Sequence, residues 1–384
     1  MTMTHFERLH MTSPLLKALS ALGYTQPTPI QEMAIPVILQ GRDIFGSAQT
    51  GTGKTAAFAL PLLQLMHQNQ SPSRQARTLV LAPTRELAQQ IHESFLAYGK
   101  HLGFRQVVIY GGVSQKPQVD ALRKGVDIII ATPGRLLDLI QQGHARLQYV
   151  QHLVLDEADR MLDMGFIADI RRLCAMVPDK RQTLFFSATL APNVKKLAAD
   201  LLHQPVSIDI KPDLHQKAHT REQVYFIERT SKTSLLSHLV QEERIDRSLV
   251  FTRTKRGADR LVKALAKKGI QAWAIHGDKS QAQRLKALEQ FKNSRVSMLI
   301  ATDVAARGID IRDLSHVINY DIPAQSDTYI HRIGRTGRAG QDGIAYSFCS
   351  PEEIAQLKDI QKFSGRKIPV GRHPYQEQSA GMAS

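Results

Sequence analysis

Residues Arg77 to Thr84 read RTLVLAPT, and residues Arg85 to Gly99 read RELAQQIHESFLAYG. The first segment is a short apolar run rich in β-branched residues, and the second has the period of a helix. The same pairing recurs at Val126–Gly134 and at His152–Asp159, each followed by a helical segment. Continuous apolar strands that alternate with helices indicate a parallel sheet covered on both faces. We therefore predict a doubly wound α/β domain with right-handed crossovers.

The alternation of strands and helices stops at the polar segment 209–220 and begins again after it. Further strands are expected at Arg247–Thr254, Ile270–Gly277, Val296–Asp303, His316–Asp321 and Gly343–Ser350. A chain of 384 residues exceeds what one core usually holds. We therefore predict two tandem, doubly wound parallel-sheet domains joined by a short linker. Their predicted bounds are 1–208 and 221–365, with the linker at 209–220 and a flexible tail at 366–384.

Composition narrows the class of protein. Lys and Arg total 50 against 35 Asp and Glu, a net charge of +15 that attracts polyanions such as nucleic acid. A merely solubilising surface is the alternative, and charge alone does not decide between them. No apolar run is long enough to cross a bilayer, and the first residues lack the apolar core of a secretory signal. Cys174 and Cys349 are too few for a disulfide framework or a zinc site and are expected as buried thiols. These features predict a cytoplasmic protein without a membrane role.

The segment AQTGTGKT, Ala48 to Thr55, follows the strand-like RDIFGS and opens the helical TAAFALPLLQLM. This context is typical of a Walker-type phosphate loop, in which backbone N–H groups and a helix N-terminus surround phosphate oxygens. Lys54 would reach the β- and γ-phosphates, and Thr55 would hold Mg²⁺. The strict pattern begins with Gly where Ala48 stands, and a simple Gly-rich turn is the alternative. The predicted ATP-binding residues of the loop are Ala48, Gln49, Thr50, Gly51, Thr52, Gly53, Lys54 and Thr55.

Two adjacent acids, Asp156 and Glu157, follow the apolar run LVL. An Asp at the end of a neighbouring strand can hold Mg²⁺, so Thr55 and Asp156 are the predicted metal-binding pair. The adjacent Glu can orient or deprotonate the attacking water. Adjacent acids also occur on ordinary solvated loops, and the phosphate loop upstream favours the catalytic interpretation.

Sequence motifs in a fixed order resemble the DEAD-box ATP-dependent RNA helicase family, from about Phe6 to about Phe363. Among its members the chain is most similar to bacterial RhlE-like helicases. The motifs of the first half are GYTQPTPIQ (23–31), the phosphate loop, PTRELA (83–88), GG (111–112), TPGR (132–135), DEAD (156–159) and SAT (187–189). Those of the second half are VFTRT (250–254), HGD (276–278), QAQR (281–284), ATDVAARGID (301–310) and HRIGRTGR (331–338).

The resemblance implies two RecA-like domains that use ATP and Mg²⁺. It assigns Phe6, Tyr24 and Gln31 to the adenine site, and a Gln amide can indeed pair with adenine N6 and N7. It assigns Gly308 and Asp310 to the ATP site from the second domain. In HRIGRTGR it assigns Arg335 and Arg338 as arginine fingers, although a solvated basic helix face is the alternative. The implied catalytic residues are Lys54, Asp156, Glu157, Arg335 and Arg338.

Loops that follow the strands are the expected RNA site, because ligands bind at the carboxyl ends of open α/β sheets. Each loop taken alone could be ordinary turn chemistry. The predicted RNA-binding residues are Pro83, Thr84, Arg85, Gly111, Gly112, Thr132, Pro133, Gly134, Arg135, Arg253, Gly277 and Thr302. The resemblance further implies that Asp159, Ser187 and Thr189 couple ATP to RNA.

The function that the resemblance implies is RNA-stimulated ATP hydrolysis coupled to interdomain closure, local strand separation and RNA release. The partners would be RNA, bound without sequence preference, and ribonucleoproteins. An ATP-gated RNA clamp or remodeller with little unwinding is one alternative, and a translocating DNA helicase is another. Spacing and charge do not distinguish RNA from DNA, since recognition of the 2′-hydroxyl leaves no clear mark here.

Overall fold

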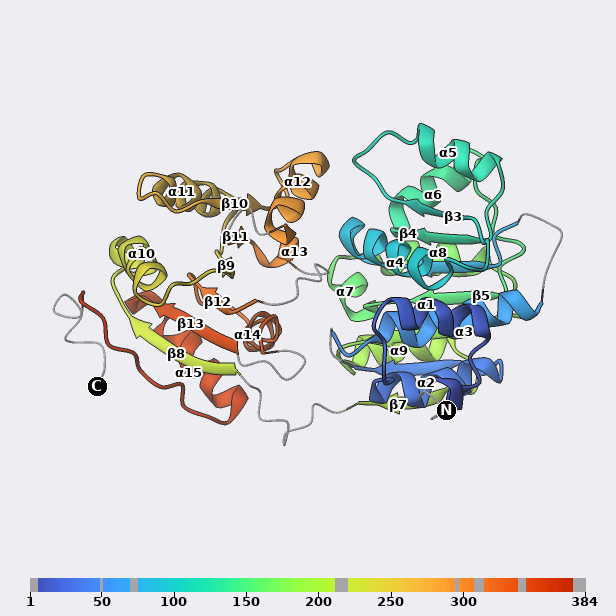
Figure 1. Ribbon diagram of the computed structural model, residues 1–384, viewed down its shortest axis with the longest axis horizontal. Coiled ribbons are helices and arrows are strands. Elements are labelled where there is room, and N and C mark those ends of the chain that lie inside the picture. Colours follow the sequence, from blue (N-terminus) through green and yellow to red (C-terminus); the bar gives the residue numbers. More distant parts are fainter. Residues whose placement is uncertain are drawn as a thin grey trace. The chain divides into compact units, whose positions relative to one another are not determined.

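A computed structural model of the chain describes residues 6–48, 51–69, 75–210, 220–293, 297–306, 314–337 and 343–375 (Figure 1). The chain divides into two compact units, Met1–Pro212 and Asp213–Ser384. Their boundary falls within the predicted linker. Each unit is a parallel sheet with helices on both faces, as the alternating pattern of the sequence predicts.

Unit 1 contains, within the described residues, a seven-stranded parallel sheet of order β3-β4-β2-β5-β6-β1-β7. The strands are β1 (Ile44–Ser47), β2 (Thr78–Leu81), β3 (Gln106–Ile109), β4 (Ile128–Ala131), β5 (His152–Leu155), β6 (Gln182–Ser187) and β7 (Val206–Asp209). Central strands such as β2, β4 and β6 are buried at every residue. Burial on both faces explains why these strands are continuous apolar runs rather than alternating ones.

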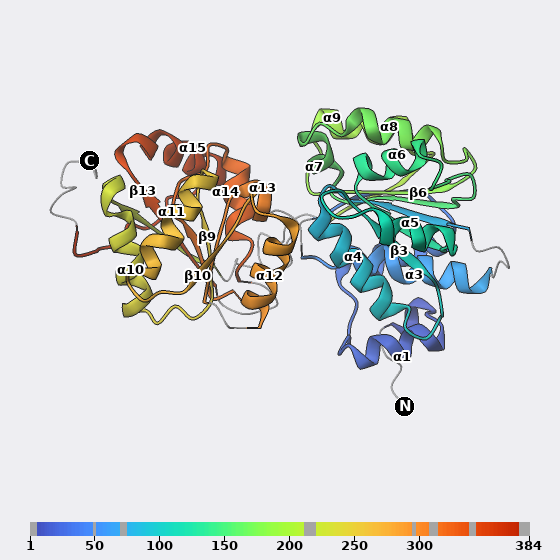
Figure 2. The ribbon, with the colours of Figure 1, turned by 90° about the horizontal axis from the view of Figure 1, so that it is seen from above.

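The helices of unit 1 form two layers. They are α1 (Ser13–Ala21), α2 (Pro29–Leu39), α3 (Lys54–Gln68), α4 (Arg85–Tyr98), α5 (Lys116–Arg123), α6 (Pro133–Gln141), α7 (Ala158–Asp163), α8 (Ile167–Ala175) and α9 (Pro192–Leu201), with a short 3-10 helix at Glu7–Leu9. Val80 and Val154 share one core with α1 to α4. Their strand neighbours Leu79 and Leu153 share the other core with α5 to α9. Figure 2 shows helices on each side of the sheet.

Unit 2 contains, in its described part, a six-stranded parallel sheet of order β10-β11-β9-β12-β13-β8. The strands are β8 (Thr220–Phe226), β9 (Ser248–Phe251), β10 (Ala272–Ile275), β11 (Met298–Ala301), β12 (His316–Asn319) and β13 (Gly343–Cys349). The helices are α10 (Lys232–Glu242), α11 (Lys255–Ala266), α12 (Gln281–Lys292), α13 (Asp303–Ala306), α14 (Ser326–Ile333) and α15 (Ile354–Ser364), with 3-10 helices at Arg229–Ser231 and Pro351–Glu353. Helices α10 and α11 pack on one face, and α12, α14 and α15 pack on the other.

The segment after α15 differs from its prediction as a flexible tail. Val224 of the edge strand β8 donates its N–H to the Pro369 carbonyl at 2.8 Å, and Gly371 donates to the Val224 carbonyl at 2.8 Å. An edge strand has unpaired backbone groups, and this segment satisfies part of them. The prediction therefore needs correction for residues 366–375, whereas residues 376–384 lie outside the described part.

Two further predictions can be compared with the structure. Cys174 and Cys349 are buried free thiols, as expected. In the described ranges, no helix has both the length and the apolar character that a membrane span requires.

Candidate active site

The strands that carry the phosphate loop and the acid pair lie on either side of β6. Strand β6 pairs in parallel with β1 and with β5. Parallel strands end at the same edge, so the loops after β1 and β5 flank the loop after β6. Ligands of open α/β sheets bind at this carboxyl edge. The order of the strands thus brings together segments that are about a hundred residues apart in the sequence.

The phosphate loop ends at Lys54, the first residue of α3. The Lys54 side chain is 5% exposed, and its ammonium donates to the Ala48 carbonyl at 2.8 Å, across the loop. Gly51 and Gly53 have φ angles of 89° and 92°, in the left-handed region that favours glycine. The loop therefore needs these two glycines for its backbone conformation. The predicted residues Thr52 and Thr55 are half-buried, and Gln49 and Thr50 lie outside the described residues.

Gln31 connects the predicted adenine site to this loop. Its side chain is 1% exposed; the amide nitrogen donates to the Gly53 carbonyl at 3.1 Å, and the amide oxygen accepts from the Thr28 backbone at 3.0 Å. A Cβ added at Gly53 would collide with the Gln31 amide. Each end of an amide can form a second hydrogen bond. Gln31 can therefore hold the loop and still recognise a base.

The two aromatic residues of the predicted adenine site contact each other. The rings of Phe6 and Tyr24 are 6.3 Å apart in an edge-to-face arrangement, and the Tyr24 hydroxyl lies 2.9 Å from that of Tyr98. Phe6 is 1% exposed and belongs to the core on the α1 to α4 side. Its stacking on a base stays a prediction.

Gln64, which sequence reasoning missed, holds the N-terminal segment that carries Phe6. Its amide oxygen accepts from the Thr12 backbone at 2.8 Å, and its amide nitrogen donates to the His10 carbonyl at 2.9 Å. The side chain is 3% exposed and projects from α3, the helix that begins at the phosphate loop. A lone Gln inside the apolar run ALPLLQLM was the available signal.

The acid pair is buried at the end of β5. Asp156 is 2% exposed, and one of its oxygens accepts from the Glu157 backbone at 3.0 Å. Burial raises the pKa of Asp156 from 3.8 to about 6, although the positive charge of Lys54 acts in the opposite direction. The positive charge of Lys54 therefore does not fully offset the cost of burying the Asp156 carboxylate.

Glu157 has an unusual backbone and a buried partner. Its φ angle is 51°, which is uncommon for a residue other than glycine and is often associated with functional sites. Its carboxylate lies 2.8 Å from the guanidinium of Arg160, and both residues are 7% exposed. Arg160 was not among the predicted residues. Its position three residues after Glu157 on a helix was the signal that could have identified it.

The predicted coupling residues do lie together at the end of β6. Asp159 accepts from the backbone N–H of Ala188 at 3.1 Å. The Ser187 hydroxyl donates to the Thr189 carbonyl at 2.8 Å and accepts from the Thr189 N–H at 3.3 Å. The contact with Asp159 is thus made by the backbone of Ala188, the middle residue of SAT. The hydroxyl contacts of Ser187 order the turn.

Two arginines meet the GG segment at the adjacent ends of β2, β4 and β3. Arg85 begins α4, and a Cβ added at Gly112 would collide with its guanidinium. Arg135 in the first turn of α6 donates to the Val113 carbonyl at 3.3 Å. A Cβ on Gly111 would lie 4.0 Å from both guanidinium groups. The other predicted residues of this edge divide by exposure: Pro83, Thr84, Thr132 and Pro133 are buried, whereas Gly134 is exposed.

In unit 2 the predicted RNA residues follow the adjacent strands β9, β10 and β11. The Arg253 side chain is 55% exposed, Gly277 is exposed and Thr302 is 8% exposed. Lys255 extends past Gly277 to form an ion pair with Asp278 at 2.7 Å. These three strand ends therefore present exposed cationic side chains, among them Arg253 and Lys255.

Both arginines of the basic segment HRIGRTGR that lie within the described residues, Arg332 and Arg335, are buried. Arg332 is 2% exposed and makes two contacts with the Asp303 carboxylate, at 2.6 and 2.8 Å, so it ties α14 to α13. Arg335 is 7% exposed. The predicted residues Gly308, Asp310 and Arg338 lie outside the described residues.

The phosphate loop, the buried acid pair and the strand order define unit 1 as a P-loop nucleoside triphosphate-binding domain. The DEAD/DEAH box helicase family matches residues 28–197, and the helicase conserved C-terminal domain matches residues 231–340. The chain belongs to the DEAD-box helicase family.

Individual relatives extend over nearly the whole chain. The DEAD-box ATP-dependent RNA helicase CshA of Geobacillus kaustophilus is 42% identical over 97% of this chain and 79% of its own length. The ATP-dependent RNA helicase CshA of Limosilactobacillus reuteri is 43% identical over 95% of this chain and 73% of its own length. The finer prediction of an RhlE-like member stays a prediction.

A solved structure of S. cerevisiae Dbp5 bound to RNA and ADP BeF3 is similar to this chain. It matches with a TM-score of 0.84 and 32% identity, covering 99% of this chain and 98% of Dbp5. Mss116p bound to ssRNA and AMP-PNP matches with a TM-score of 0.86 and 27% identity, covering 98% of this chain and 80% of that one. The predicted fold class of two tandem parallel-sheet domains is confirmed.

Proposed function

We propose that this protein is an ATP-dependent RNA helicase in which RNA-stimulated ATP hydrolysis drives closure of the two units, local strand separation and RNA release. The observation that carries the proposal is the juxtaposition of Lys54, after β1, with Asp156 and Glu157, after β5, on the two sides of β6. The relatives named above are ATP-dependent RNA helicases, and the similar Dbp5 structure contains RNA together with a nucleotide.

A phosphate oxygen of ATP would take the place of the Ala48 carbonyl as the acceptor for the Lys54 ammonium. The Lys54 ammonium donates to a neutral backbone carbonyl of Ala48. A phosphate oxygen carries negative charge, so its hydrogen bond with the ammonium gains a Coulomb attraction that the neutral carbonyl lacks, and the phosphate is the better acceptor. Lys54 would therefore turn from Ala48 to the β- and γ-phosphates. The Gln31 contact with Gly53 would make the conformation of the loop depend on the base.

Mg²⁺ fits the residues of this edge. The Thr55 hydroxyl and the Asp156 carboxylate are hard oxygen ligands, and a cation would stabilise the Asp156 carboxylate, which is 2% exposed and whose pKa is raised by burial. Across the described ranges, no group of three or more His, Cys, Asp or Glu side chains could hold a metal ion. Mg²⁺ in nucleotide sites is usually held by one or two carboxylates and the phosphates. When bound, it neutralises charge that develops on the phosphates.

Glu157 would orient the attacking water and accept its proton. The Arg160 guanidinium, 2.8 Å from the Glu157 carboxylate, would fix the direction of that side chain. Arg335 and Arg338 would stabilise the negative charge of the transferred phosphoryl group from unit 2. An arginine finger is worth about 10³–10⁵ in rate, so ATP on unit 1 alone would turn over slowly.

RNA would lie along the strand ends of both units. Arg85 and Arg135 at the GG segment and Arg253 in unit 2 would contact backbone phosphates, which carry no sequence information. If RNA and ATP each favour the closed state, each raises the affinity for the other by the same factor. We also propose that the protein is located in the cytoplasm, as its composition predicts.

Strand displacement tests the proposal. The full chain should separate a short RNA duplex with ATP, and RNA should stimulate its ATPase more than DNA of equal sequence. If the duplex separates equally well with a non-hydrolysable ATP analogue, unwinding does not depend on ATP hydrolysis. ATP-dependent RNA binding without any separation would instead support an ATP-gated RNA clamp. Equal stimulation by DNA would contradict the preference for RNA.

A further inference from the structure

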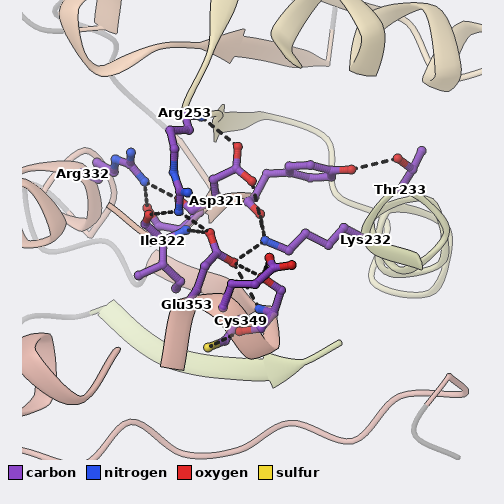
Figure 3. A network of polar contacts seen from close by, with 12 residues as sticks. Lys232, Thr233, Arg253, Asp321, Ile322, Arg332, Cys349 and Glu353 are labelled. Atoms are coloured by element: carbon purple, nitrogen blue, oxygen red, sulfur yellow. Dashed lines mark hydrogen bonds and ion pairs between the residues drawn. The ribbon is translucent and has the colours of Figure 1, made fainter. Parts of the chain in front are cut away.

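A buried charged network lies beneath Arg253, one of the predicted RNA-contacting residues of unit 2 (Figure 3). Lys232, the first residue of α10, is 0% exposed. Its ammonium donates to the Glu353 carboxylate at 2.6 Å and to the Tyr320 carbonyl at 2.7 Å, and it lies 3.6 Å from the Asp321 carboxylate. A fully buried lysine requires such compensation, because an unpaired buried charge is costly.

Glu353 is the centre of this network. One carboxylate oxygen accepts from the Arg253 guanidinium at 2.8 Å and from the Ile322 N–H at 3.1 Å. The other accepts from Lys232 and from both the backbone and the hydroxyl of Ser350, at 3.1 and 2.9 Å. The Glu353 side chain is 4% exposed. Five donors from four parts of the chain thus fix its position.

Arg253 is the member of the network that reaches solvent. Its backbone N–H donates to the Asp321 carboxylate at 2.8 Å, and its guanidinium is held by Glu353 and by the Ile322 carbonyl at 3.4 Å. Its side chain is nevertheless 55% exposed. The strands that lead into these residues, β9, β12 and β13, are neighbours in the sheet. The network therefore converges at the carboxyl edge where nucleic acid is expected.

The distribution of charge explains why the lysine is needed. Two carboxylates, Glu353 and Asp321, lie close to Arg253 and would cancel its charge without a second cation. The Lys232 ammonium supplies that cation from the buried side. The solvent side of the network then presents a guanidinium with donors left for a phosphate, since guanidinium has five N–H groups.

We propose that Glu353, with its charge balanced by Lys232, is a positioning residue that aims the Arg253 guanidinium at an RNA phosphate. This inference rests on the proposed function, in which Arg253 contacts RNA. A fixed guanidinium loses less side-chain entropy on binding than a free one. The alternative is a purely structural network that joins the strand ends, and the two differ in their effect on the salt dependence of RNA binding.

The test uses the full chain, a fluorescent single-stranded RNA, Mg²⁺ and a non-hydrolysable ATP analogue, with Kd measured from low to high salt. Glu353→Gln should weaken binding about 10-fold, the factor for about 1.4 kcal/mol. The slope of log affinity against log salt should become shallower by about 0.7, the value for one phosphate contact on a single strand. Arg253→Gln should have the same two effects.

The double variant Arg253→Gln, Glu353→Gln should bind no more weakly than Arg253→Gln alone, because coupled residues are not additive. Glu353→Gln removes the nearest charged partner of the buried Lys232 and could unfold unit 2. The charge-balanced variant Lys232→Met, Glu353→Gln avoids this cost and should show the same shallow slope with a cooperative melt. Asp200→Asn, which breaks an exposed ion pair with Arg171 in unit 1, is the matched control.

Two results would overturn the proposal. The first is that both Glu353→Gln and the charge-balanced variant bind RNA with the affinity and the salt dependence of the wild type. The second is that the double variant Arg253→Gln, Glu353→Gln loses as much affinity as the two single variants together. A wild-type protein that fails to bind RNA at all would instead contradict the proposed function. The two failures are therefore distinguishable in one set of titrations.

Discussion

The buried carboxylate of Asp156 should destabilise the ligand-free protein at neutral pH. Its pKa is raised from 3.8 to about 6, chiefly by burial. One pKa unit corresponds to 1.36 kcal/mol, so the charged carboxylate costs about 3 kcal/mol of folding free energy. Because the folded pKa lies above the unfolded one, this cost is absent below pH of about 4. It develops as pH rises and is complete above pH of about 6.

The Asp156→Asn substitution removes the charge at nearly constant volume. Without nucleotide and Mg²⁺, the variant should be more stable than the wild type by about 3 kcal/mol at pH 8, and the gain should shrink towards zero near pH 4. For a unit of about 200 residues, this gain corresponds to a rise in Tm of about 6–12 °C. With Mg²⁺ and ATP the order should reverse, since only the wild type gains stability from the ligand.

Denaturant titrations of both proteins at several pH values measure this effect. Asp200→Asn, at an exposed ion pair, serves as the control and should change stability by less than about 1 kcal/mol at every pH. A variant no more stable than the wild type at pH 8, or a gain that does not depend on pH, would refute the reasoning.

Three further substitutions test individual residues of the site. Glu157→Gln should still bind RNA and ATP but hydrolyse ATP about 10²–10⁴-fold more slowly in a single-turnover assay, because general base catalysis is lost; normal turnover would contradict its role. Gln31→Ala should reduce the preference for ATP over GTP in competition binding, and an unchanged preference would show that the adenine assignment is wrong. Gln64→Met removes two partly buried hydrogen bonds to the segment that carries Phe6, so KM for ATP should rise about 10-fold with kcat nearly unchanged. A wild-type KM in that variant would assign Gln64 a structural role alone.

Much of the fold is readable in the sequence because its central strands are buried on both faces. Strands β2, β4 and β5 appear as continuous apolar runs, and each is followed by a helix. The edge strands β7 and β8 are only partly buried, so their sequences do not form such runs. The contact of residues 366–375 with β8 depends on the edge of a folded sheet, which local sequence cannot reveal.

The site shows a similar division. The positions of Lys54 and Asp156 could be predicted because the segments that follow buried parallel strands lie at the binding edge of the sheet. The contacts of Gln64 and Glu353 could not be predicted, since their partners Thr12 and Lys232 are 52 and 121 residues away in the sequence. The lone Gln64 in an apolar run indicates a buried polar group but does not identify its partner. The roles of Gln64 and Glu353 arise from tertiary contacts, and a helical period or a strand pattern does not report these contacts.

The central claim is that hydrolysis of ATP on unit 1 needs guanidinium groups from unit 2. Single-turnover ATP hydrolysis at saturating RNA, with Arg335→Lys and Arg338→Lys compared with the wild type, tests this claim most directly. Each variant should bind ATP normally and hydrolyse it about 10³–10⁵-fold more slowly. Hydrolysis at the wild-type rate in both variants would contradict the account.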